Sequence, residues 1–266
     1  MNKVALITGG SSGLGFELAR RLGQSGYTVY LIARNPERLL MAVNQLKTEG
    51  IDVAGFPVDV LDEAGLVMVR EQLSARYSKL DYLVLNAGIV KSKLFSSYEK
   101  SDDLRQQLDV NLWGTILPAH VMCPLLKSGA KILMISSGGG LMGIAGYTVY
   151  CASKAGVVNF AEALRRELLC KKISVYVACP GDFDSPMSHD AIADAPAWMK
   201  KQSSGKKLMT AGKVAEKILS KAVGTSRFLI YPASEVKILM LIKRLPRILS
   251  DKILDAMLPI PAAGDK

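Results

Sequence analysis

Tyr150 and Lys154 are the residues of this chain whose types and spacing most directly suggest chemistry. Of the nine tyrosines, only Tyr150 has a lysine four positions later. On a helix this spacing places both side chains on one face. A lysine ammonium there stabilises the phenolate and lowers a tyrosine pKa that is normally about 10. The pair predicts a group that exchanges a proton with a substrate, although an exposed surface pair has the same spacing.

A glycine-rich turn directly follows the first apolar run. From Thr8 the sequence reads TGGSSGLG, a Gly-x-x-x-Gly-x-Gly pattern. Glycines between a strand and a helix let backbone N–H groups approach a pyrophosphate, and the helix N-terminus adds its dipole. A turn without a ligand is the alternative, but the flanking strand and helix favour a dinucleotide site. The contacts expected from this turn are Gly9, Ser11, Ser12, Gly13, Leu14 and Gly15.

The end of the second apolar run predicts which dinucleotide binds. It reads LIARN, with no carboxylate at Ala33 and a guanidinium at Arg34. A carboxylate at this place binds the ribose 2′-hydroxyl of NAD, whereas an arginine accommodates and pairs with a 2′-phosphate. A solvated surface arginine is the alternative. We expect NADP(H) as cofactor, with Arg34 and the hydroxyl of Ser11 at the 2′-phosphate.

Apolar runs of strand length alternate with longer segments rich in Leu, Ala, Glu and Arg. This alternation predicts an α/β fold, a doubly wound parallel sheet of about seven strands between two helical layers. Helices are expected at residues 15–25 and 152–169, among others. The expected strands are Val4–Thr8, Thr28–Ala33, Val53–Val58, Leu80–Leu85, Lys131–Ser136, Ile173–Ala178 and Arg227–Tyr231.

Several motifs, taken together and in order, resemble the short-chain dehydrogenase/reductase family over residues 3 to about 232. Besides the glycine turn these are Asn86-Ala87-Gly88 after the fourth strand and Ser137, thirteen positions before Tyr150. The resemblance implies a Rossmann-type catalytic domain over residues 1–234, with Asn111, Ser137, Tyr150 and Lys154 as catalytic residues. It also implies cofactor contacts at Asp59, Val60, Asn86, Ala87, Gly88, Tyr150, Lys154, Pro180, Gly181, Phe183 and Ser185.

The family's chemistry implies a role for each catalytic residue. Tyr150 is the general acid in reduction and the base in oxidation, while Lys154 lowers its pKa and holds the nicotinamide ribose. Ser137 hydrogen-bonds the carbonyl oxygen of the substrate. Asn111 holds a water that links Lys154 to solvent. Ser136 competes with Ser137, but the spacing to Tyr150 favours Ser137.

The stretch after the sixth strand departs from the family pattern. It reads PGDFDSP from Pro180, with Phe183 in place of a small aliphatic residue and Ser185 in place of threonine. It is similar to the Asp-x-Asp-Thr-Pro run of the 3-ketodihydrosphingosine reductase branch. We therefore expect a reductase of a hydrophobic β-keto compound, such as a keto-sphingoid base or a 3-oxoacyl compound. The alternatives are a specialised-metabolite or steroid-like alcohol or ketone and, outside enzymes, an NADPH-binding sensor or scaffold.

Two regions fall outside the alternation of strands and helices. Residues 184–210 have weak periodicity, which predicts a long loop that acts as an active-site lid. Residues 235–266 form a basic extension in which Leu249, Ile253, Ala256 and Met257 have amphipathic helical spacing. Such an extension packs on the core or in an oligomer interface, or it lies on an anionic membrane surface.

The composition limits the remaining classes. A net charge of +10 favours an anionic partner, but no recognition-helix or zinc-finger pattern indicates nucleic acid. The four cysteines form no Cys-x-x-Cys pair and there are only two histidines, so we expect neither a metal site nor a disulfide framework. The short first apolar run and the lack of a spanning segment predict a cytoplasmic protein. We also expect a homodimer or homotetramer. Peripheral membrane contact through the extension is left open.

Overall fold

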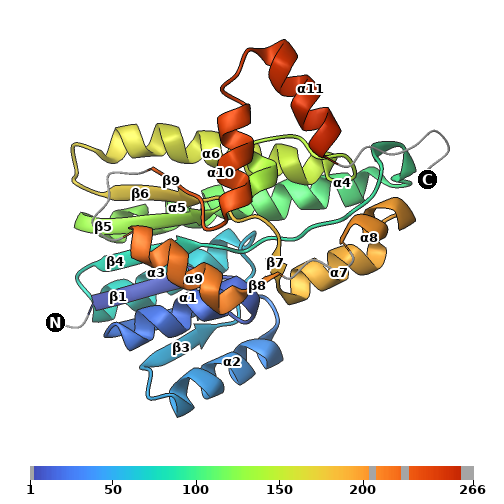
Figure 1. The fold of residues 1–266 in the computed structure, drawn as a ribbon. Coiled ribbons are helices and arrows are strands. Elements are labelled where there is room, and N and C mark those ends of the chain that lie inside the picture. Colours follow the sequence, from blue (N-terminus) through green and yellow to red (C-terminus); the bar gives the residue numbers. More distant parts are fainter. Residues whose placement is uncertain (1–2, 204–207, 223–227, 259–266) are drawn as a thin grey trace.

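The computed structural model of this chain describes residues 3–203, 208–222 and 228–258. Its core is a parallel sheet in the order β3-β2-β1-β4-β5-β6-β9, covered by helices on both faces (Figure 1). This confirms the expected doubly wound α/β fold. The strands are β1 (Lys3–Thr8), β2 (Tyr27–Ile32), β3 (Val53–Phe56), β4 (Leu80–Leu85), β5 (Leu126–Ile135), β6 (Ser174–Ala178) and β9 (Leu229–Ile230).

The apolar runs become strands because both faces of the sheet are buried. In β1, Leu6 belongs to the apolar core on one face and Ile7 to the core on the other, as a two-residue repeat requires. Leu6 is level with Tyr30 in β2 and with Leu83 in β4. In a continuous run of Val, Leu and Ile, alternate side chains therefore pack against the helical layers on the two faces of the sheet.

The two helical layers follow the same division of the core. One face carries α1 (Gly13–Gln24), α2 (Pro36–Thr48) and α9 (Ala211–Ala222). The other carries α3 (Glu63–Arg76), α5 (Gly114–Met122) and α6 (Thr148–Leu168). A further helix, α4 (Ser101–Leu108), leads through the π-helical turn η2 (Asp109–Trp113) into α5. Three short 3-10 segments complete this part: η1 (Phe95–Ser97), η3 (Cys123–Leu125) and η4 (Gly138–Gly140).

The strand boundaries differ from the sequence prediction by one or two residues in most strands and by five at the start of β5. β5 begins at Leu126, five residues before the predicted start, because Leu80 pairs with Leu126 across a register shift in the ladder. The last strand is shorter than predicted, and Arg227 lies outside the described residues.

The prediction of a long loop over residues 184–210 is wrong. The segment contains α7 (Pro186–Asp194) and α8 (Ala197–Ser203), and β7 (Phe183–Asp184) pairs with β8 (Met209–Thr210). The helix α7 begins with a capping box between Ser185 and Ser188 and has proline at its first position, signals that fix a helix start even where apolar periodicity is weak. Residues 204–207 lie outside the described part.

The extension consists of two helices, α10 (Ser234–Ile242) and α11 (Arg247–Met257). The break falls at Pro246, which occupies the N-cap of α11. Val236 fixes α10 to the body, since it is 3% exposed and faces the backbone at Gly138. Residues 259–266 of the predicted extension lie outside the described residues. None of the helices in the described ranges combines the length and apolarity that crossing a bilayer requires.

Candidate active site

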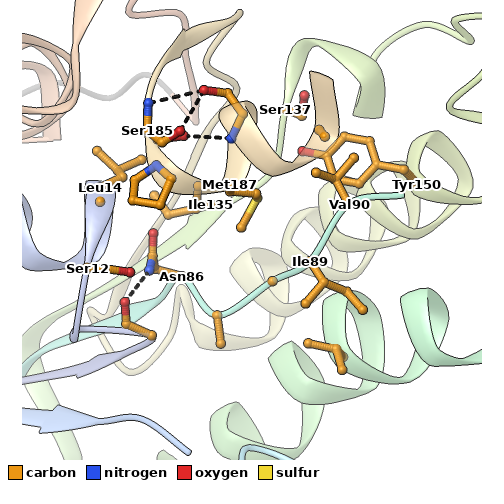
Figure 2. Close-up of a pocket in the computed structure, with 18 of the residues that line it drawn as sticks. Ser12, Leu14, Asn86, Ile89, Val90, Ile135, Ser137, Tyr150, Ser185 and Met187 are labelled. Carbon is orange, nitrogen blue, oxygen red and sulfur yellow. Dashed lines mark hydrogen bonds between the residues drawn. The ribbon is translucent and has the colours of Figure 1, made fainter. Parts of the chain in front are cut away.

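A cavity of about 450 Å³ opens at the carboxyl ends of the parallel strands (Figure 2). It lies where the strand order reverses between β1 and β4, the usual ligand position in doubly wound sheets. The structure brings the predicted site residues together here: all of them line the cavity except Gly15 and Asn111. One end is formed by Arg34 and the other by Tyr150 with the segments around it.

The backbone conformation of the glycine turn requires glycine at several positions. Gly9 and Gly13 have φ angles of +65° and +54°, in the left-handed region. A Cβ on Gly15 would lie 2.2 Å from the carbonyl oxygen of Gly9. Gly15 therefore acts by close packing, outside the cavity. The N-cap of α1, Ser12, makes no side-chain capping bond, so the first amides of the helix are available to an anion.

Asn86 fixes the glycine turn to the neighbouring strand. Its side-chain amide donates to the carbonyl oxygens of Thr8 and Gly9 at 3.1 and 3.0 Å. The Thr8 hydroxyl accepts from the backbone N–H of Asn86 at 3.0 Å. The side chain of Asn86 thus shapes the turn that would hold a pyrophosphate, while Ala87 and Gly88 follow along the cavity wall.

Two arginines stand at the far end of the cavity. Arg34 is 74% exposed in its side chain and pairs loosely with Asp59, at 3.8 Å between Nη1 and Oδ2. Arg38 lines the same end and was missed from the sequence. Asn35 caps α2 by accepting from the backbone N–H of Arg38 at 2.8 Å, which holds Arg38 in the first turn of that helix. The Asn-Pro helix start was the signal that could have located it.

The two candidate serines have different hydrogen-bond partners. The Ser136 hydroxyl is buried and donates to the backbone carbonyl of Lys154 at 2.8 Å. The Ser137 hydroxyl accepts from the Gly139 backbone N–H at 3.1 Å and faces the hydroxyl of Tyr150 (Figure 2). Only Ser137 has a hydroxyl placed for a substrate oxygen beside Tyr150, in line with the spacing argument.

Burial controls the ionisation of the tyrosine–lysine pair. Burial raises the pKa of Tyr150 to about 12, and the hydrogen bond with Ser137 opposes that rise. Burial also lowers the pKa of Lys154 to about 8. The Lys154 Nζ donates to the Ile135 carbonyl at 3.0 Å and lies 5.9 Å from the centre of the Tyr150 ring. The expected lowering of the tyrosine pKa is therefore not seen, and Tyr150 holds its proton at neutral pH.

Asn111 is fully buried in the π-helical turn, and its side chain binds protein groups. Its Oδ1 accepts from the Ile89 N–H at 2.7 Å, and its Nδ2 donates to the Ile89 carbonyl and the Ser153 hydroxyl at 2.9 and 3.0 Å. The amide thus joins the segment after β4 to α6, which carries Tyr150 and Lys154. Asn111 positions these elements; its predicted role in holding a water stays a prediction.

The remaining wall near Tyr150 is mostly apolar and was not predicted. It comes from the segment after β4, the segment before α6, and α7 with the residues beyond it; its apolar members include Ile89, Val90, Val110, Ile144, Met187, Ile192 and Leu208. The Asp182 carboxylate also lines this end and makes no hydrogen bond or ion pair with any described residue. Its charge adds to the burial that raises the pKa of Tyr147 and Tyr150.

The Ser185 hydroxyl is hydrogen-bonded to the backbone of α7. Its hydroxyl accepts from the Ser188 backbone N–H at 3.2 Å and so caps α7. The start of α7 lies against the glycine turn, because a Cβ on Gly13 would come within 3.8 Å of Pro186. The segment predicted as a lid therefore covers the cavity with a helix end.

A glycine turn at a helix start, two arginines at one end of the cavity and a Ser–Tyr–Lys group at the other define a dinucleotide-dependent oxidoreductase. The short chain dehydrogenase family model matches residues 3–196. This match covers more than half of the chain, which therefore belongs to the short-chain dehydrogenase family. Enzymes of this family act on carbonyl or hydroxyl groups with a nicotinamide cofactor.

Two curated relatives illustrate the range of the family. The chain is 33% identical over 199 residues to the 11-beta-hydroxysteroid dehydrogenase-like 4A protein of Arabidopsis thaliana, covering 74% of this chain and 66% of that protein. It is 35% identical over 192 residues to the human 3-oxoacyl-(acyl-carrier-protein) reductase, covering 71% and 79%. The chain thus spans about two thirds of the length of the plant relative.

Solved structures share the fold over most of the chain. The Pseudomonas aeruginosa RhlG complex with NADP has a TM-score of 0.75 at 29% identity, covering 86% of this chain and 94% of that chain. The apo form of LigD from Sphingobium has a TM-score of 0.77 at 26% identity, covering 97% and 98%. Both similarities extend beyond the glycine turn to the whole sheet.

Proposed function

We propose that this protein is an NADPH-dependent reductase of a hydrophobic β-keto compound. The observation that carries the proposal is the placement of Tyr150, with Ser137 at its hydroxyl, inside an apolar wall at one end of the cavity. Burial raises the pKa of Tyr150, so the tyrosine holds the proton that carbonyl reduction must transfer to the substrate oxygen.

The protein groups contribute orientation and a proton. A bound nicotinamide supplies the hydride. The Ser137 hydroxyl donates a hydrogen bond to the carbonyl oxygen of the substrate. This hydrogen bond strengthens as that oxygen gains negative charge. The Tyr150 hydroxyl gives its proton to the same oxygen. The Lys154 ammonium, 5.9 Å from the centre of the Tyr150 ring, would hold positive charge near the developing alkoxide and would bind the nicotinamide ribose of the cofactor.

NADPH is favoured over NADH by the charges at the other end of the cavity. Arg34 and Arg38 provide two guanidinium groups there, and Ser11 lines the same cavity with a hydroxyl. A phosphate monoester binds well to such a set, because arginine pairs with phosphate through two parallel hydrogen bonds. RhlG, which is similar in structure, was solved with NADP.

The substrate end favours an apolar chain and, beside it, a cationic group. The apolar side chains around Tyr150 suit an alkyl chain, and the Asp182 carboxylate, which is unpaired among the described residues, attracts an ammonium but repels phosphate and carboxylate. A keto-sphingoid base carries an amine next to its ketone, whereas a 3-oxoacyl carrier thioester brings a phosphate. We therefore rank the keto-sphingoid base first and the 3-oxoacyl compound second; a steroid-like ketone or specialised metabolite would have no need of Asp182.

NADPH oxidation with a panel of ketones tests this proposal. Long-chain 2-amino-3-ketones should be turned over faster than their N-acetyl derivatives, and Asp182→Asn should remove that difference without affecting a neutral ketone. Tyr150→Phe should abolish turnover while sparing NADPH binding, measured by fluorescence titration. Tight NADPH binding without turnover of any ketone would instead favour the sensor or scaffold. A Tyr150→Phe enzyme with near-normal kcat would refute the mechanism.

We also propose that the protein assembles as a homodimer or homotetramer. Leu108 and Trp113 are 39% and 51% exposed at the end of α4 and in the following turn. Large apolar side chains so placed are typical of an interface. A monomeric mass in light scattering at micromolar concentration would count against this proposal.

A further inference from the structure

Exposed apolar side chains are concentrated in the two C-terminal helices. The described residues include fifteen large hydrophobic side chains that are exposed, and six of them lie within residues 234–258. This segment is less than a tenth of the chain, so the concentration is several-fold. The six are Ile238, Leu241, Leu245, Ile248, Leu249 and Met257.

The turn between α10 and α11 combines this apolar surface with positive charge. Residues 243–249 are seven consecutive exposed residues with the sequence KRLPRIL. They include three cations and no carboxylate, and Ile248 is 78% exposed. Figure 1 shows this turn at the outer end of the two helices, beyond the layers that cover the sheet. We call residues 243–249 the basic turn.

We propose that the basic turn binds the surface of an anionic lipid bilayer, with Leu245, Ile248 and Leu249 entering the boundary between headgroups and acyl chains. Apolar side chains at the acyl boundary and arginines or lysines at the headgroups are the arrangement of interfacial membrane segments. Each cation near an anionic surface contributes through attraction to the lipid charge. The inference does not depend on the identity of the substrate or cofactor.

The charges of the basic turn disfavour a second copy of the chain as its occupant. In a twofold interface the same patch meets its own copy, so the cations of the basic turn would lie close to those of the second copy. The carboxylate nearest along the chain, Asp251, is already paired with Arg247 at 3.4 Å. Negative lipid headgroups supply the complement that the chain itself lacks at this turn.

The basic turn is fixed to the part of the protein that carries the active site. The Lys243 ammonium donates to the backbone carbonyl of Leu141, directly after η4. Val236 in α10 faces the backbone at Gly138 and at Gly181, and Gly181 lines the cavity. In α11, Leu254 and Ser250 are buried. A bilayer bound at the turn would therefore hold the whole enzyme at the surface, with the cavity in a set orientation to it.

Vesicle flotation with the full chain tests the proposal. The probes are phosphatidylcholine vesicles and vesicles in which about a third of the lipid is phosphatidylserine. The wild-type protein should float with the anionic vesicles only, and high salt should release it. Arg244→Gln with Arg247→Gln should weaken binding about twenty-fivefold, since each cation contributes about a fivefold factor. Leu245→Ser with Ile248→Ser should weaken it as well.

Matched controls separate the basic turn from general surface properties. Leu40 and Met41 are 61% and 71% exposed on α2, and their paired change to serine should leave flotation unchanged. Lys47→Gln with Lys127→Gln removes two exposed cations elsewhere and should have a small effect. NADPH oxidation by each variant in vesicle-free buffer should stay normal.

Three results would overturn the proposal. These are absence of flotation with anionic vesicles, equal flotation with neutral vesicles, and equal losses for the control and turn variants. A turn variant that changes the oligomeric state in light scattering, without vesicle binding by the wild type, would assign the surface to a second copy instead. None of these results bears on whether the enzyme reduces a ketone, so the two proposals fail separately.

Discussion

Replacing Arg34 by alanine should change the cofactor preference far more than the stability of the protein. Its ionic partner among the described residues is Asp59, at 3.8 Å, and the Arg34 side chain is 74% exposed. Exposed ion pairs contribute about 0–1 kcal/mol, so the free energy of unfolding should hardly change. The guanidinium has more effect on a doubly charged phosphate that approaches it from the cavity.

The size of the expected loss of kcat/KM for NADPH follows from the exposure of Arg34 and Arg38. A hydrogen bond to a charged group is worth about 1.5–3 kcal/mol, and solvent screening at Arg34 argues for the lower end. Arg34→Ala should therefore reduce kcat/KM for NADPH about tenfold. Arg38→Ala should cost a similar factor, and the double variant about a hundredfold if the two contributions are independent. NADH lacks the phosphate and should lose little; without Arg34, the Asp59 carboxylate is freer for its ribose.

The assay is steady-state kinetics with NADPH and NADH in parallel at a saturating ketone concentration. Arg166→Ala is the matched control, because Arg166 is also exposed and paired with a carboxylate, Glu162, at 2.6 Å on α6. The NADPH defect should shrink in high salt, which already screens the wild-type attraction. Equal losses for both cofactors, or an unchanged kcat/KM for NADPH in the double variant, would refute the assignment of the 2′-phosphate to this end.

Three further predictions concern ionisation and packing. Because burial lowers the pKa of Lys154 to about 8, the ammonium is present below that pH and lost above it; kcat/KM for NADPH should fall as pH rises through about 8, and a flat profile to high pH would contradict this. Gly15→Ala places a Cβ 2.2 Å from a backbone oxygen and should abolish cofactor binding in fluorescence titration, whereas Gly143→Ala, with open space around it, should not. Leu18→Ala, at a fully buried site, should lower the unfolding free energy by about 2–5 kcal/mol in urea, while Leu40→Ala at an exposed site should change it by less than about 0.5 kcal/mol.

The sheet and the cofactor end could be predicted because their signals are local. A run such as Val4–Thr8 is apolar at every position only when both faces are covered, so it indicates a parallel strand directly. Gly15 is required by a backbone approach within the turn itself, and Gly9 by its left-handed φ. The sequence prediction missed Arg38 as a residue of the cofactor end, because the position of Arg38 depends on how the Asn35 cap fixes the first turn of α2.

The substrate end could not be predicted because its residues meet only in the folded chain. Val90, Ile144, Met187 and Leu208 come from four separate segments without periodicity of their own. The helix α7 was missed for a related reason: its capping box lies within the departure from the family pattern, where Ser185 was assigned to the cofactor. The Ser185 hydroxyl caps the start of α7, and Ser185 also lines the cavity, so its contact with the cofactor stays a prediction.

The tyrosine–lysine pair shows why proximity in sequence does not give the sign of an electrostatic effect. The spacing of Tyr150 and Lys154 correctly places them on one helix face. Burial acts on both, however, and it disfavours charge on either group: the tyrosine pKa rises to about 12 and the lysine pKa falls to about 8. The Lys154 ammonium is present below about pH 8, but its pull on the phenolate does not outweigh the effect of burial on Tyr150. Tyr150 therefore keeps its proton, which is the state that carbonyl reduction requires at its start.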